Sequence, residues 1–245
     1  MTGSVPTLLA DPAARKKRQL EKRNLILRWL RCNTWSTSEV LREVVGLASR
    51  QAVSSTLGAL VRDGMLRRAV IHNDYGAPVL VWGITAHGAA MAATPDECVN
   101  IRLFESSKVN PSTLAHTLDL QRAQFRSERA GWRWLTNTGE FSKSEAKYAD
   151  AVAIRQDGQK IAIEIERTVK TAKRYAEILV AHLAARKEGK WEWIYYLSPD
   201  EAIRDRVKRL FMEIHHANWH GRSITITDTH RSPFVFYTYK DDWTS

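Results

Sequence analysis

The sequence predicts a protein of mixed α/β (α+β) class. A small helical domain comes first, and a larger mixed sheet flanked by helices follows it. Three observations predict this division. Apolar side chains recur at helical spacing through residues 15–93. Short apolar runs typical of strands alternate with helical patterns through residues 112–245. Residues 94–111, between these two parts, hold few regular patterns and are predicted to be a linker.

The composition excludes several classes of protein. The 245 residues can hold one large domain or two small ones. No apolar run is long enough to span a bilayer, and residues 1–11 lack the basic lead of a secretory signal, so we expect no membrane insertion. Two cysteines, Cys32 and Cys98, are too few for a disulfide framework or a cysteine zinc site, and they favour a cytoplasmic setting.

The net charge of +10 is concentrated near the beginning of the chain. Residues 1–93 carry 13 Lys/Arg against 6 Asp/Glu, whereas the remaining residues carry 24 against 21. The first third is therefore the part that we expect to bind a polyanion.

Three helices are predicted in this basic part. Residues 1 to about 14 are expected to be disordered or extended, and a basic stretch then leads into the first helix. Thr37 or Ser38 is expected to cap the second helix, and Ser49 opens a third that Gly64 ends. The apolar positions of the three helices are Leu25, Ile26, Trp29 and Leu30, then Val40, Leu41, Val44 and Val45, then Val53, Leu57, Leu60 and Val61.

A hairpin follows the three helices. Residues 66–72 and 79–84 are its predicted strands, and residues 85–93 are predicted to form a short closing helix. Three helices followed by a hairpin are the order of a winged helix-turn-helix domain, whose third helix enters the major groove of DNA. The alternative is a small helical domain for protein contact.

The residues expected to contact DNA fall into two groups. Residues of the first group lie on the third helix away from its apolar stripe, where they can reach base edges. Residues of the second group are positioned to contact DNA phosphates. The first group is Arg50, Gln51, Ser54 and Ser55, and the second is Arg62, Arg67 and Arg68. In the alternative interpretation these side chains are simply solvated.

The second part is predicted to begin with the order α-β-β-β-α-β-α-β and to end with one further strand. Ser112 is expected to cap its first helix, which runs to about Ala130. The later elements are a strand at 132–136, two strands within 148–166, a helix at 169–187, a strand at 191–197, a helix at 199–215, and strands at 224–227 and 234–239.

The two strands within residues 148–166 carry acids where a sheet core needs apolar side chains. Gly158 suggests a three-residue loop, which places Asp150 opposite Glu164 and brings both onto one face with Glu166. A two-residue loop would place Asp150 opposite Ile165 and separate the acids. The first register predicts a site for a hard metal ion; the alternative is a solvated strand end.

An acid on one strand and Glu-x-Glu at the end of the next resemble the PD-(D/E)xK restriction-endonuclease-like core. The family pattern has proline before the first acid, where this chain has Ala149. It has lysine at its last position, where this chain has Glu166. Some restriction endonucleases also have glutamate at the last position. The basic residue is then expected from Lys170 or Lys173, just inside the next helix.

The whole chain resembles the MobC class of plasmid mobilization relaxases and the related replication-relaxation family. The resemblance covers roughly residues 25–215 and depends mostly on 149–151 and 163–168, with His116-Thr117-Leu118 similar to a segment before the core. It implies a protein that binds double-stranded DNA at a plasmid transfer origin and nicks one strand with Mg²⁺ or Mn²⁺. It also implies other relaxosome proteins and a coupling protein as partners.

The resemblance implies a role for each acid. Asp150 and Glu164 would be metal ligands, Glu166 would orient or deprotonate water or hold a second ion, and Lys170 or Lys173 would stabilise the phosphate. The alternative function is that of a DNA-binding accessory protein or repressor of plasmid transfer or replication with an inactive nuclease fold. An endonuclease that makes double-strand breaks is a third hypothesis.

Other candidates are given simpler interpretations. Glu128 is interpreted as a solvated helix residue rather than a further ligand, and His116 as a structural histidine. The group His215, His216 and His220 has the wrong spacing for a strand metal site and is expected at a helix end. Tyr195 and Tyr196 are interpreted as core or groove aromatics.

Overall fold

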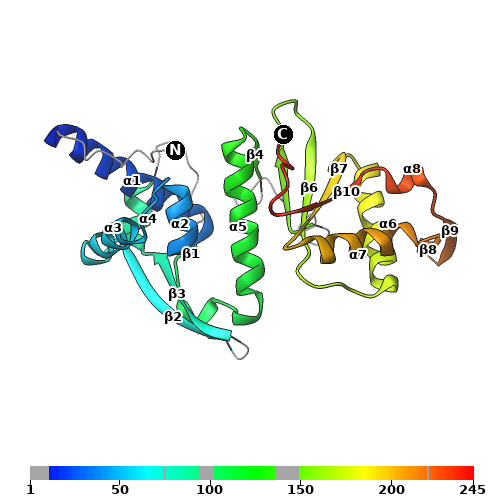
Figure 1. Cartoon of the computed structure of the whole chain (residues 1–245), viewed down its shortest axis with the longest axis horizontal. Helices are drawn as coiled ribbons and strands as arrows, with labels where there is room; N and C mark the ends of the chain where they lie inside the picture. Colours follow the sequence, from blue (N-terminus) through cyan, green and yellow to red (C-terminus); the bar gives the residue numbers. More distant parts are fainter. Residues whose placement is uncertain (1–10, 74–75, 94–101, 136–148, 220) are drawn as a thin grey trace, which may run out of the picture. The chain divides into compact units, whose positions relative to one another are not determined.

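The structure, a computed structural model, describes residues 11–73, 76–93, 102–135, 149–219 and 221–245. The chain divides into two compact units, Met1–Leu114 and Ala115–Ser245, and each unit is described by itself. Among the described residues, no helix combines the length and the apolar character needed to cross a lipid bilayer. The mixed α/β fold with helices first and a flanked sheet second is confirmed (Figure 1).

Unit 1 has three helices followed by a hairpin, in the predicted order. Its elements are α1 Pro12–Asn33, β1 Trp35–Thr37, α2 Ser38–Val44, α3 Arg50–Arg62, β2 Leu66–Asn73, β3 Gly76–Ile84, α4 Ala86–Met91, and the 3₁₀ turns η1 Ser106–Lys108 and η2 Pro111–Thr113. The strand β1 was not predicted. It pairs antiparallel with β3 to give a sheet in the order β1-β3-β2.

The first helix begins earlier than predicted. The Asp11 carboxylate accepts hydrogen bonds from the N–H groups of Ala13 and Ala14, and Pro12 occupies the first helical turn. Proline is favourable there because its missing N–H would have no partner within the helix. The expectation that residues 1 to about 14 are disordered or extended is therefore wrong from Pro12 onward.

Two helix caps of unit 1 follow the sequence signals, whereas Thr37 occupies the N-cap position of α2 without a side-chain hydrogen bond. The Ser49 hydroxyl accepts a hydrogen bond from the N–H of Ala52 at the start of α3, and Thr85 does the same for Gly88 in α4. Gly64 follows α3 with φ +70°, as expected of a stop signal. The core of this unit is built from Ile26, Leu27, Leu30, Val40, Leu41, Val53, Leu57, Leu60 and Ile84.

Part of the segment expected to be a linker packs on unit 1. The N–H of Phe104 donates to the Ile84 carbonyl at 3.1 Å, and its buried ring lies over Gly83. A side chain at position 83 would collide with this ring. Residues 102–111 therefore add to the core of this unit.

Unit 2 is a mixed five-stranded sheet between helices. Its elements are α5 Leu114–Arg129, β4 Arg133–Trp134, β5 Ala151–Ile154, β6 Lys160–Ile165, α6 Ala172–Lys187, β7 Trp193–Ser198, α7 Glu201–Met212, β8 His216–Trp219, β9 Arg222–Thr225, α8 Asp228–Arg231 and β10 Phe234–Thr238. The order is β10-β7-β6-β5-β4, parallel from β10 to β6 and antiparallel from β6 to β4.

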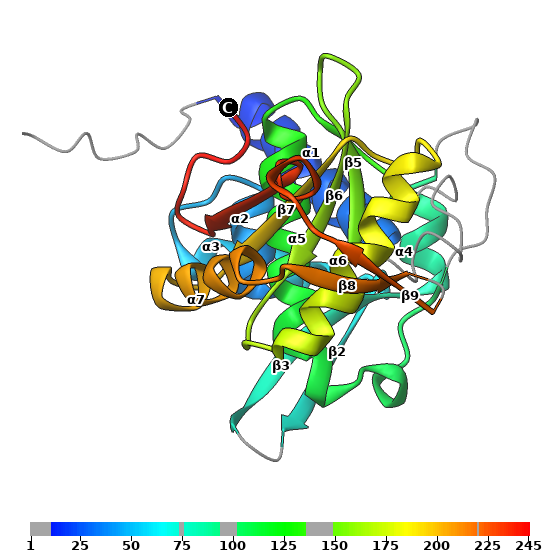
Figure 2. The same cartoon turned by 90° about the vertical axis from the view of Figure 1, so that its right-hand side faces the viewer.

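Each face of this sheet has its own core. Side chains of α6 and α7 pack against Val152, Ala162 and Tyr196 on one face. On the other face, Ala123 of α5 packs with Ile163 and its neighbours. Figure 2 shows α6 and α7 lying across the strands on the near side.

The region after α7 differs from the prediction. The helix ends at Met212 rather than near residue 215, and residues 216–219 form β8, which pairs with β9 in a separate two-stranded sheet. The buried Arg231 guanidinium ties this region together because it donates to main-chain carbonyls, including that of Ile214 at 2.6 Å. The expectation that the histidine group lies at a helix end is therefore wrong for His216.

Candidate functional site

The β5–β6 hairpin has the register that a three-residue loop predicts. Gly158 has φ +87°, and the Arg155 N–H donates to the Gln159 carbonyl at 2.9 Å. Ala151 pairs with Ile163, and one step further along Asp150 faces Glu164. The predicted register is confirmed.

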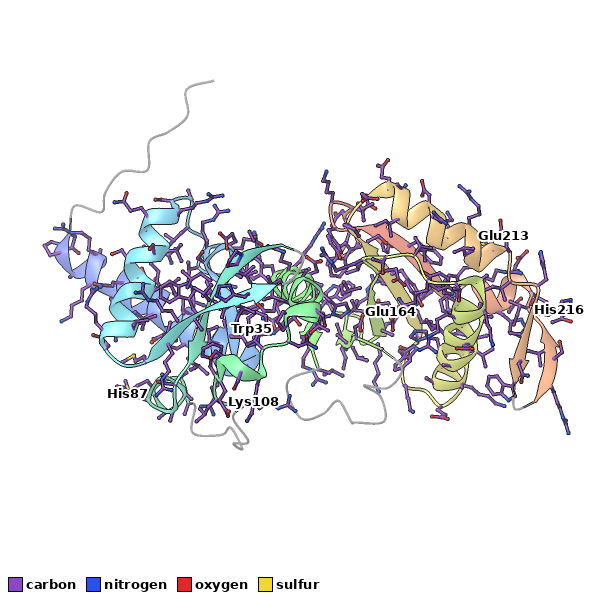
Figure 3. The ribbon with its side chains drawn as sticks, turned by 90° about the horizontal axis from the view of Figure 1, so that it is seen from below. Trp35, His87, Lys108, Glu164, Glu213 and His216 are labelled. Atoms are coloured by element: carbon purple, nitrogen blue, oxygen red, sulfur yellow. The ribbon has the colours of Figure 1, made fainter. Side chains whose placement is uncertain are left out.

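The three acids share one face of the sheet. Since side chains alternate along a strand, Asp150 is on the side of Val152, and Glu164 and Glu166 are on the side of Ala162. This is the face that α6 and α7 cover. The register thus places the three acids on one face of the sheet, and Figure 3 shows Glu164 within this unit.

Asp150 is held from two sides. Its Oδ2 atom accepts a hydrogen bond from the N–H of Ile165 at 2.8 Å and lies 3.1 Å from Nε2 of His116 on α5. The hydrogen bond to Asp150 raises the pKa of His116, and burial opposes this. The structural role expected for His116 therefore includes direct contact with the first acid of the motif.

Glu164 lies against a fully buried histidine of α6. Its Oε1 atom is 3.2 Å from Nε2 of His182, whose ring packs edge-on against Trp191 and Phe234. Burial raises the pKa of Glu164, and His182 counteracts this. The sequence analysis missed His182, although it lies on the buried stripe of α6 with Leu179, where a histidine is unusual.

Glu166 is the most buried of the three acids. Its side chain is 3 % exposed, and both of its carboxylate oxygens lie 2.5 Å from Nζ of Lys170. Burial raises the pKa of Glu166, and Lys170 opposes the rise. Lys170 precedes α6, which Thr171 caps, so its expected place inside the helix is wrong. Lys173 is in the helix but is exposed.

A buried tyrosine stands beside the acids. Tyr196 of β7 pairs with Glu164, and its hydroxyl has no hydrogen-bond partner among the described residues. Burial raises its pKa well above the ordinary value, and the negative charges of Glu164 and Glu166 raise it further. A neutral phenol that lacks a partner here can donate to a water or an anion. Tyr196 is a core aromatic, as expected, but its polar end faces the acid cluster.

The residues present fit one kind of metal ion. No group of three His, Cys, Asp or Glu side chains in the described part of the chain is arranged to hold an ion. Mg²⁺ is held by one or two carboxylates and keeps several waters, and Asp150 and Glu164 lie close enough for the Asp150 charge to raise the pKa of Glu164. A cation would also offset the free-energy cost of burying an ionised Glu164. A water bound to it could accept a hydrogen bond from the Tyr196 hydroxyl. The site fits a hydrated divalent cation rather than a closed cage.

Other candidates lie outside this cluster. Glu128 is exposed and accepts a hydrogen bond from Gln124 at 2.8 Å, as expected of a solvated residue. His215 and His216 are exposed, and Figure 3 shows His216 on β8, apart from Glu164. His220 lies outside the described residues. Tyr195 packs in the opposite core of the sheet.

The predicted DNA-contacting side chains are all exposed in unit 1. The apolar stripe of α3 is buried at Val53, Leu57 and Leu60, so the opposite side of the helix faces solvent. That side carries Arg50, Gln51, Ser54 and Ser55, with Arg62 at the end of the helix and Arg67 and Arg68 on β2. The structure brings the first four together on one helix surface.

Comparison with known proteins identifies the family. A family model described as replication-relaxation matches residues 27–218, which span both units and well over half of the chain. Searches among curated proteins and among solved structures gave no match. The chain belongs to the replication-relaxation family.

Proposed function

We propose that this protein nicks one strand of double-stranded DNA at a plasmid transfer origin, with Mg²⁺ or Mn²⁺ as its cofactor. The observation that carries the proposal is the convergence of Asp150, Glu164 and Glu166 on one sheet face, with Lys170 beside them. Membership of the replication-relaxation family supports a role in plasmid replication or relaxation.

Asp150 and Glu164 are the proposed cation ligands. When bound there, the cation supplies an activated water and positive charge against the charge that develops on the phosphate. Glu166 orients the attacking water and accepts its proton, a task that its raised pKa favours because a more basic carboxylate accepts a proton more readily. As that proton arrives, Lys170 moves from Glu166 toward the phosphate. The P–O bond to the leaving strand end breaks, and the leaving oxygen takes a proton from solvent. His182 holds Glu164 in place from behind.

Unit 1 is proposed to bind the origin as a winged helix-turn-helix domain. The exposed surface of α3 would enter the major groove, where Arg50 and Gln51 can contact base edges. Arg62, Arg67 and Arg68 would contact phosphates. Other relaxosome proteins and a coupling protein are the proposed partners of the complex.

The test is a nicking assay on supercoiled plasmid that carries the protein's own origin. With Mg²⁺ we expect open circles, lost with Asp150→Ala and with Glu164→Ala, whereas the gel shift of the origin stays largely intact. Glu128→Ala, a change at an exposed acid of the same unit, is the matched control and should nick normally. Linear product would point to double-strand cleavage instead.

A second function is favoured by one observation. Each acid of the cluster lies against a basic side chain of its own, namely His116, His182 or Lys170. Acids that already have such partners need no cation, which supports a non-catalytic DNA-binding accessory protein or repressor. Supercoils that remain intact with Mg²⁺ and with Mn²⁺, together with a normal gel shift, would favour this second function.

A further inference from the structure

The first half of α1 extends beyond the core of unit 1. The buried side chains of this helix all lie in its second half, at Ile26, Leu27, Trp29 and Leu30. Residues 12–22 contribute none of them, and Figure 1 shows this half, in dark blue, projecting past the other elements of the unit. Most helices in proteins are stabilised by tertiary packing. This half is instead supported by the Asp11 cap and by its continuity with the packed half, and it adds nothing to the core.

The helix α1 is strongly basic. It carries 8 of the 13 Lys/Arg of residues 1–93, and Glu21 is its only acid. Arg15 and Arg18 are three residues apart, and Arg18 and Lys22 are four apart. Like charges at these spacings repel on a helix, and positive charge near the amino end opposes the helix macrodipole. These charges therefore cost the free helix stability, and a bound polyanion would offset that cost.

The basic residues continue the buried side of α1. Residues four, seven or eleven apart lie on nearly the same side of a helix. Lys22 is four residues before Ile26, and Arg15 is seven residues before Lys22. The side that packs into the core thus becomes a basic stripe, made of Arg15, Arg18 and Lys22. Within the described part of the chain, its one ion pair is the exposed contact of Arg18 with Glu21, at 3.4 Å.

The basic stripe begins beside the carboxyl end of α3. Arg23, which follows Lys22, forms an ion pair with Asp63 at 3.1 Å. Asp63 directly follows Arg62, the last residue of α3 and a proposed phosphate contact. A duplex whose major groove receives α3 has its phosphate backbones along the borders of that groove. The basic stripe therefore starts where the backbone of DNA bound to α3 is expected.

We propose that Arg15, Arg18 and Lys22 form an interaction surface for DNA phosphates that flank the base pairs contacted by α3. A membrane surface fits less well, because a helix that lies on a membrane needs an apolar side. The exposed leucines of α1, Leu20 and Leu25, are five residues apart, which places them about 140° apart around the helix. This inference rests on the proposed function in that it takes unit 1 to bind DNA.

Binding measurements in EDTA test the basic stripe without any cutting. The full chain is titrated with a fluorescent origin duplex and with an unrelated duplex over a range of salt concentrations. Arg15→Gln/Lys22→Gln should reduce the slope of log K against log salt by about 1.8, twice the value for one phosphate contact. Kd should rise roughly tenfold for both duplexes alike, because phosphate contacts carry no sequence information.

The matched control is Lys17→Gln/Arg28→Gln. It removes the same charge from the same helix, at two exposed positions that lie on a different side from the basic stripe. Net charge alone predicts equal effects from the two double variants, whereas the basic stripe predicts that the control keeps the wild-type slope. Equal slopes in the two variants would overturn the proposal, as would a wild-type slope in Arg15→Gln/Lys22→Gln.

A charge-retaining variant separates charge from packing. Arg15 and Lys22 lie outside the core, so the glutamine variant should melt at the wild-type temperature. Arg15→Lys/Lys22→Arg keeps both charges and should bind DNA as the wild type does. If it binds as weakly as the glutamine variant, packing rather than charge is responsible, and the proposal is overturned.

The failures of the two proposals are distinguishable. A wild-type protein that binds DNA but never nicks would contradict the proposed function, whereas the salt slopes would still decide the basic stripe. A protein that nicks normally and has an unchanged slope in Arg15→Gln/Lys22→Gln would lose only the basic stripe. If that variant instead loses binding to phosphatidylglycerol vesicles and keeps full binding to both duplexes, the surface binds a membrane and the proposal is overturned.

Discussion

At the scale of single residues, Glu164 is placed where an ionised carboxylate is costly. Burial raises its pKa above the ordinary 4.5, and the neighbouring negative charge of Asp150 adds to the rise. Nearby His182 and Lys170 offset part of that cost. A buried acid of this kind is expected where a cation binds, because a functional site gives up some stability for its chemistry.

Glu164→Gln should therefore stabilise the cation-free protein at neutral pH. A raised folded-state pKa contributes stability that is fully present below pH 4.5 and lost as pH rises through the folded pKa. Glutamine does not ionise, so this loss should disappear from the variant. Thermal melting in EDTA from pH 4 to pH 8 measures it. A variant that melts below the wild type at pH 7 would contradict the account.

Lys170→Ala tests the third acid. The change leaves Glu166, 3 % exposed, without its cation and should cost about 1–2 kcal/mol, a value reduced because Lys170 is itself 38 % exposed. Lys173→Ala, at an exposed position three residues later, is the matched control and should be neutral. Chemical denaturation measures both, and equal effects would refute the pairing.

The sequence predicted the acids but not their surroundings. Gly158 fixed the loop length, and the loop length placed Asp150 opposite Glu164. His182 comes from a helix that follows the acids in sequence, so only the folded chain shows that it contacts Glu164. Helical periodicity places a residue on a face but does not identify what it meets.

At the scale of elements, two helical glycines have opposite surroundings. A Cβ atom at Gly58 in α3 would meet only Arg62, at 3.7 Å, whereas a Cβ atom at Gly88 in α4 would lie 2.1 Å from the Met65 carbonyl oxygen. The first position has space for a side chain, and the second is closed by main chain. Gly88 therefore allows α4 to approach the start of β2 closely.

Gly58→Ala should raise the free energy of unfolding by about 0.5–1 kcal/mol, because alanine loses less conformational entropy in a helix. Gly88→Ala should lower it by about 1–3 kcal/mol, because the backbone must shift. Urea denaturation of the two variants provides the measurement. Stabilisation by Gly88→Ala would show that α4 does not pack as described.

The elements that were predicted poorly depend on tertiary pairing. β8 alternates polar and apolar residues over only four positions, too few to predict a strand, so it is a strand only because β9 pairs with it. β1 is three residues long and depends on β3 in the same way. By contrast, α3 was predicted well because a capping serine, an apolar stripe and a terminal glycine all agree.

At the scale of the whole molecule, the two units are proposed to divide the work, with unit 1 reading DNA and unit 2 cutting it. Arg50→Ala should weaken binding to the origin more than binding to unrelated DNA, since its contact is to a base. Arg67→Ala should weaken both alike and reduce the salt slope by about 0.9. Competition titrations with the two kinds of DNA separate these outcomes. Full origin binding by residues 94–245 alone would contradict the division.

Asp150 and Glu164 are proposed above all to hold a divalent cation. Anomalous diffraction from crystals soaked in Mn²⁺ locates such an ion independently of the protein atoms. We expect a peak between the two carboxylates that is absent from Asp150→Ala crystals. If the wild-type crystals show no peak there, or show one only beside His215 and His216, these two acids do not hold the cation.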